Sequence, residues 1–74
     1  MAKSRRVKID YRKLGRERAF GFTDGIDVAV DSRLKGKKRL EIINHELLHY
    51  LFPELEEDEI VEKSVILTNT LWFE

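Results

Sequence analysis

The chain of 74 residues is long enough for one small domain, and its lack of cysteine excludes a fold held by disulfides. Net charge is zero, yet residues 1–40 carry 13 Lys and Arg against 5 Asp and Glu, whereas residues 41–74 carry 1 against 9. A core of this size stabilises a fold only weakly, so we expect help from a bound metal, a partner chain or unusually good packing.

Nucleic-acid binding and membrane insertion are both disfavoured by the charge and hydropathy pattern. The two charged halves can attract each other across one compact fold, which we prefer to a basic face that binds nucleic acid. Few aromatic residues, namely Tyr11, Phe20 and Phe22, are interleaved with the basic ones, and no nucleic-acid-binding signature occurs. No apolar run reaches the length of a signal peptide or a membrane span, so we expect a cytoplasmic protein without membrane contact.

Three short strands are predicted in the first 31 residues. Residues 5–14, RRVKIDYRKL, alternate between apolar and polar side chains with the period of a half-buried strand. Residues 18–25 form a second strand that closes on Asp24 and Gly25, a pair suited to a tight turn. Residues 25–31, GIDVAVD, alternate again. Consecutive strands joined by short turns usually pair, so we expect a three-stranded antiparallel sheet.

Two helices are predicted in the remainder of the chain, where the hydrophobic period changes to three and four residues. The first helix carries Leu40, Ile43, Leu47 and Leu51. Pro53 ends it, and residues 54–74 begin with acids that favour a helix start. The second helix carries a stripe of Ile60, Ser64, Leu67 and Leu71, widened by Val61, Val65 and Trp72. We therefore expect one α+β domain over residues 1–74, with the element order βββαα.

Both histidines of the chain lie in the sequence HELLH on the first predicted helix. His45 and His49 are one helical turn apart, so their imidazoles project from the same face and can reach one ion. Glu46 lies one position round the helix, where its carboxylate can accept a proton from a water on that ion. This spacing is typical of metal-assisted peptide hydrolysis and favours zinc.

A third protein ligand is needed, and with no third histidine it must be a carboxylate. The acidic start of the second helix supplies six candidates: Glu54, Glu56, Glu57, Asp58, Glu59 and Glu62. Glu59 lies beside the start of the core-facing stripe and Glu56 lies one turn before it, so these two are best oriented. Glu57 remains an alternative, because it precedes Val61 by one turn.

The order of strands, a helix bearing HELLH and a second helix supplying an acid resembles the zincin metallopeptidases, in particular the gluzincins, whose ligands are His, His and Glu. The chain is also similar, over nearly its whole length, to compact metallopeptidase domains often encoded by phages. That likeness runs from YRKLGRERAFGFTDG through IDVAVDSRLKGKKRLEIINHELLHYLFPELEEDEIVE to the final LW. It implies His45 and His49 as zinc ligands, Glu46 as general base, and a glutamate of the second helix as third ligand.

The gluzincin motif around the third ligand can be aligned with this sequence in two ways. On EIVEKS it selects Glu59, and on EEDEIV it selects Glu56; we prefer Glu59. The resemblance also implies that a sheet edge above the metal helix pairs with an extended peptide. We therefore expect a minimal zincin-like, zinc-dependent peptidase that acts on a peptide or protein. The alternatives are a zinc-stabilised binding module without turnover and a basic-faced nucleic-acid binder.

Overall fold

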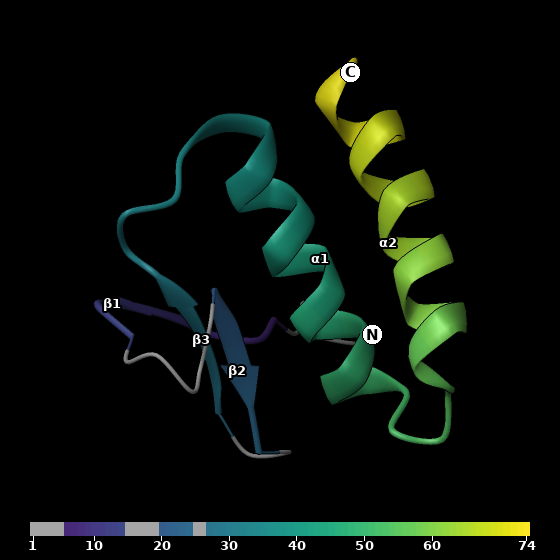
Figure 1. Cartoon of the computed structure of the whole chain (residues 1–74), viewed down its shortest axis with the longest axis horizontal. Coiled ribbons are helices and arrows are strands. Elements are labelled where there is room, and N and C mark those ends of the chain that lie inside the picture. Colours follow the sequence, from purple (N-terminus) through teal and green to yellow (C-terminus); the bar gives the residue numbers. More distant parts are fainter. Residues whose placement is uncertain (1–5, 15–19, 25–26) are drawn as a thin grey trace, which may run out of the picture.

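The computed structural model describes residues 6–14, 20–24 and 27–74, and it has the expected α+β arrangement. A small sheet is followed by two helices, with α1 lying between the sheet and α2 (Figure 1). The elements are β1 (Ile9–Arg12), β2 (Gly21–Thr23), β3 (Val28–Asp31), α1 (Gly36–Leu51) and α2 (Glu57–Trp72). The element order βββαα is therefore confirmed. The predicted turn residue Gly25 lies outside the described residues.

The sheet is mixed, so the predicted antiparallel sheet is wrong in one of its two pairings. Its strand order is β1-β3-β2, with β1 parallel to β3 and β2 antiparallel to β3. The prediction assumed that neighbours in sequence are neighbours in space. Instead the most apolar strand takes the centre: Val28, Ala29 and Val30 are fully buried. A strand covered on both faces gains most from a central place, where backbone groups on both of its edges can be paired.

Asp31 closes the central strand with a buried carboxylate that is 1% exposed. Arg33 satisfies it through its backbone N–H at 2.9 Å, its Nε at 2.9 Å and a terminal nitrogen at 2.7 Å. These hydrogen bonds from Arg33 hold the pKa of the Asp31 carboxyl well below its usual range, so the group stays ionised. The turn from β3 into α1 is thereby fixed.

Helix α1 begins and ends where its sequence requires. Gly36 takes a φ of 63°, a left-handed conformation that a glycine adopts without a steric penalty. The helix ends at Leu51, two residues before Pro53, as predicted, and the Phe52 N–H donates to the Leu48 carbonyl at 2.9 Å. This hydrogen bond completes the last turn of α1, which carries His49.

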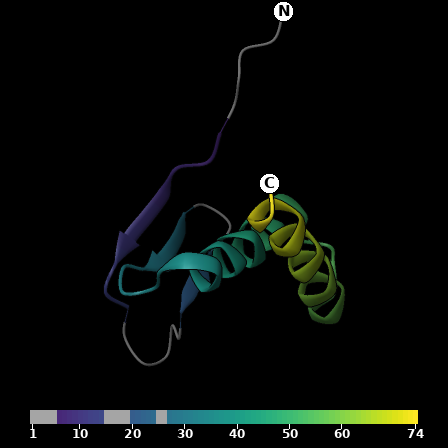
Figure 2. The ribbon, with the colours of Figure 1, turned by 90° about the horizontal axis from the view of Figure 1, so that it is seen from above.

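Helix α2 packs on α1 and lies away from the sheet (Figure 2). Its buried line is Ile60, Ser64 and Thr68, and the Asn44 amide of α1 donates to the Thr68 hydroxyl at 3.1 Å. The predicted stripe is thus right for Ile60 and Ser64 but not for Leu67 and Leu71, which are 39% and 50% exposed. Helix α1 covers only a narrow strip of α2, and the apolar residues of α2 extend beyond that strip. Neither described helix is long and apolar enough to cross a membrane.

Candidate metal site

The two histidines lie side by side on the last two turns of α1. Their ring centroids are 4.9 Å apart with an interplanar angle of 60°. The side chains of His45 and His49 are 22% and 31% exposed, so both rings are largely covered but reachable from solvent. The predicted common face of the pair is therefore present.

Glu57, the first residue of α2, faces both histidines. Its Oε2 lies 3.2 Å from the His45 Nε2, and its Oε1 lies 2.9 Å from the His49 Nε2. The short connection after Pro53, in which the Leu55 N–H donates to the Phe52 carbonyl, sets the start of α2 opposite the end of α1. Glu57 thus meets His49, which precedes it by eight positions, and His45, which precedes it by twelve.

This trio could hold a metal ion. The ligand atoms of His45, His49 and Glu57 all lie within 4.8 Å of one another. Ligand atoms of a tetrahedral zinc lie about 3.3 Å apart, given bonds of about 2.0 to 2.1 Å. The nitrogen-to-oxygen distances of 3.2 and 2.9 Å are near that separation, although each runs to a different oxygen of Glu57. Because the spacing within the trio reaches up to 4.8 Å, the side chains would have to close around an ion.

Glu59 is placed elsewhere, in a hydrogen-bonded cap at the start of α2. Its carboxylate accepts the Glu56 backbone N–H at 3.1 Å, and the Glu56 carboxylate accepts the backbone N–H of Glu59 in return. This capping box uses both glutamates that the sequence ranked first as third ligand. The alternative Glu57 is the acid that the structure brings to the histidines. No sequence signal singled out this pair, because E-x-x-E also occurs at Glu54–Glu57 and Glu59–Glu62, and the usual N-cap residue is Ser, Thr, Asp or Asn.

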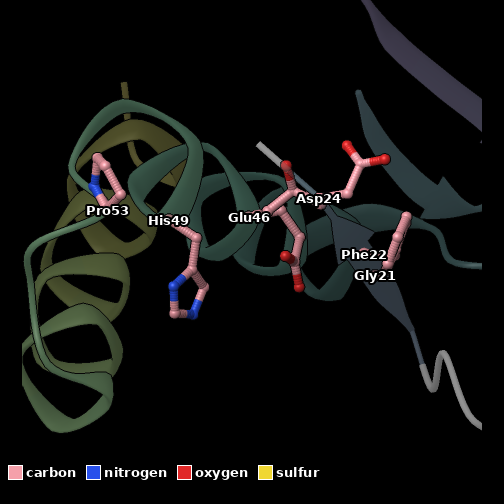
Figure 3. A pocket seen from close by; sticks show the side chains of 7 residues that line it. Gly21, Phe22, Asp24, Glu46, His49 and Pro53 are labelled. Carbon is pink, nitrogen blue, oxygen red and sulfur yellow. The ribbon is translucent and has the colours of Figure 1, made fainter. Parts of the chain in front are cut away.

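Glu46 points into a pocket of about 500 Å³ between α1 and β2. Figure 3 shows the side chains of Glu46 and His49 pointing to the same side of α1. The pocket is lined by Gly21, Phe22, Thr23, Asp24, Glu46, His49 and Pro53. Burial raises the pKa of the Glu46 carboxyl; the two histidines oppose that rise and Glu57 adds to it. Because its pKa is raised and it lies beside two metal-ligand candidates, the Glu46 carboxylate is suited to accept a proton.

Gly21 of β2 touches the Glu46 side chain, a close approach that sequence reasoning missed. A Cβ at this position would lie 2.8 Å from the Glu46 Cγ, 2.8 Å from an Ile42 methyl and 2.9 Å from the Glu46 Oε2. Contacts under 3.0 Å force a displacement. Gly21 therefore allows β2 to pack onto α1 and fixes where the carboxylate of Glu46 sits.

Replacing Gly21 by alanine should lower the free energy of unfolding by about 1–3 kcal/mol, because the added methyl overpacks the contact between β2 and α1. Urea denaturation measures this cost. With Glu46 already replaced by alanine, the same substitution should cost less, since two of the three close contacts are gone. An equal cost in both backgrounds would mean that Gly21 does not constrain Glu46.

Comparison with known proteins gives no independent guide to this site. A scan against family models and searches of curated proteins and solved structures found no match to the chain. Functional inference therefore rests on the geometry of the site itself.

Proposed function

We propose that the protein is a zinc-dependent peptidase of minimal zincin type. The observation that carries this proposal is the Glu57 carboxylate in contact with both histidine Nε2 atoms, next to a pocket that Glu46 and His49 line together. In this proposal His45, His49 and Glu57 are the metal ligands, and Glu46 is the general base. Glu57 replaces Glu59 as the preferred third ligand.

The donor set supports a transition metal over calcium or magnesium, and the His-Glu-x-x-His spacing on one helix favours zinc among these. Two imidazole nitrogens and one carboxylate form a ligand set found in catalytic zinc sites, whereas calcium and magnesium favour oxygen ligands alone. A bound zinc supplies a polarised water whose pKa falls to about 7. His45, His49 and Glu57 would hold the ion, and the partial exposure of His49 would keep it reachable from solvent.

Glu46 is the proton carrier in this proposal. Its carboxylate accepts a proton from the attacking water as the water oxygen adds to the peptide carbonyl carbon. The protonated carboxyl then donates this proton to the leaving amine as the carbon–nitrogen bond breaks, so the residue returns to its starting state. Burial raises the pKa of this carboxyl in the metal-free chain, whereas a bound zinc would lower it, so the support for this role is the position of Glu46 beside His49 in the pocket.

An extended polypeptide fits the open shape of the pocket better than an enclosed small molecule does. Strand β2 forms one wall through Gly21, Phe22 and Thr23, and Glu46 and His49 of α1 form the other. A chain that lies along β2 would present its peptide carbonyls to the histidine edge of α1. The resemblance to zincins supports this direction, because there a strand above the metal helix guides the substrate.

A zinc-stabilised binding module without turnover is the second candidate. Among the described residues that line the pocket, none is a lysine, arginine or tyrosine that could stabilise a developing oxyanion. The ligand set would still bind zinc, and the binding free energy would then stabilise a fold with a small core.

The test is cleavage of an unfolded protein by the zinc-loaded chain, followed by electrophoresis and mass spectrometry. We expect cleavage that stops when a chelator removes the metal, together with a lower melting temperature. A zinc-dependent melting temperature with no cleavage would support the binding module instead. Identical melting with and without chelator would contradict both.

A further inference from the structure

Helix α2 and the residue at its C-cap, Phe73, expose several large apolar side chains. Seven of them are between 39% and 78% exposed: Val61, Val65, Ile66, Leu67, Leu71, Trp72 and Phe73. Scattered apolar residues need no explanation, but exposed apolar residues that share one side of a helix mark a candidate interaction site. None of these exposed apolar residues belongs to the histidine cluster of His45, His49 and Glu57.

Four of these residues form a seam at heptad spacing, which we call the outer seam: Val65, Ile66, Trp72 and Phe73. Val65 and Trp72 are seven residues apart, and so are Ile66 and Phe73. Asn69 lies midway between the two pairs. This spacing places both pairs on one side of the helix, turned from the buried line through Ser64. Trp72 and Phe73, at the end of the seam, also border the start of α1 at Gly36 and Lys37.

The two helices also place opposite charges at opposite ends of the molecule. Helix α1 starts among Lys35, Lys37, Lys38 and Arg39, whereas α2 starts with Glu57, Asp58 and Glu59. The start of α1 lies beside the end of α2, where the Lys37 Nζ is 5.4 Å from the centroid of the Phe73 ring (Figure 1). One end of α2 is therefore acidic and the other has a basic neighbour.

We propose that the outer seam binds a second copy of this chain, with the two α2 helices antiparallel about a two-fold axis near Asn69. In that arrangement Val65 opposes the second copy's Phe73, and Ile66 opposes the second copy's Trp72. The same rotation brings Glu62 past the end of the partner helix, toward the second copy's Lys37. A two-fold interface requires a self-complementary surface, and this one is complementary in both apolar spacing and charge.

The pairing leaves the metal-site residues free. Glu57 lies eight residues before Val65, about 12 Å along the helix axis. A seam of two turns is smaller than a standard stable interface, so the dimer should have micromolar affinity and dissociate on dilution. Its formation does not depend on whether the histidine cluster binds metal or catalyses a reaction.

Sedimentation equilibrium of the full chain between about 5 µM and 1 mM tests the proposal across the range of micromolar affinities. The mass should rise with concentration from 8.8 kDa toward twice that value. Ile66→Glu should hold the protein at the monomer mass, whereas Leu71→Glu should still associate. The two positions are matched controls, because they are 58% and 50% exposed on the same helix but only Ile66 lies in the seam.

Charge reversal tests the orientation of the two copies. Glu62→Lys and Lys37→Glu should each weaken association about fivefold to tenfold, because each change occurs twice in a symmetric dimer. The double variant should recover most of the lost affinity. An 8.8 kDa mass at every concentration would overturn the proposal. Equal effects of the Ile66 and Leu71 variants, or no recovery in the double variant, would also overturn it.

Discussion

Replacing Glu57 by glutamine should weaken zinc binding by about a hundredfold or more. The substitution keeps the size of the side chain but exchanges a charged carboxylate for an amide oxygen, a poor zinc ligand. Loss of residues that merely support zinc ligands already costs about 10- to 100-fold in affinity, so loss of a direct ligand should cost at least as much. Competition with a chromophoric chelator measures the affinity.

Glu59→Gln is the matched control, because Glu59 lies two residues away on the same helix and undergoes the same change of side chain. It should leave zinc affinity within about threefold and lower the free energy of unfolding by up to about 1 kcal/mol, since its carboxylate caps α2 and does not face the histidines. A large loss of affinity in Glu59→Gln with none in Glu57→Gln would restore Glu59 as the third ligand.

Glu46→Gln should abolish peptide cleavage and keep the metal. Removal of a general base typically costs about 10²- to 10⁴-fold in rate, because the attacking water then has no positioned proton acceptor. Zinc affinity should change only a few-fold, since His45, His49 and Glu57 are intact. The fold should also persist, because the glutamine has the same shape and no charge for burial to disfavour.

Glu54→Gln serves as the control for that variant, since Glu54 is an exposed acid in the connection between the helices. It should cleave the substrate at the rate of the unchanged protein. If Glu46→Gln also cleaved at that rate, the proposed role of Glu46 would be wrong even with zinc bound.

The elements of the fold were predictable because their signals are local. Alternation marked the strands, spacing of three and four marked the helices, and Pro53 marked the end of α1. Strand pairing was not predictable in this way, because the choice of β3 as central strand depends on burial from both faces. Likewise, the exposure of Leu67 and Leu71 follows from how little of α2 is covered by α1, which no local pattern reveals.

In the candidate site, too, the features set by local sequence were predictable and those set by tertiary packing were not. His45, Glu46 and His49 share one helix, so their relative placement followed from helical geometry alone. The acid that faces them depends on how the turn after Pro53 sets α2 against α1, and on which glutamates the helix start uses for capping. Zinc and peptide hydrolysis remain predictions from the chemistry of these side chains.

Calorimetric titration of the metal-free protein with zinc tests the central claim most directly. The account predicts one zinc per chain, with an affinity that falls as pH drops and the histidines become protonated. It also predicts that His45→Ala, His49→Ala and Glu57→Gln each abolish most of the binding. Absence of saturable zinc binding by the unchanged, folded protein at neutral pH would contradict it.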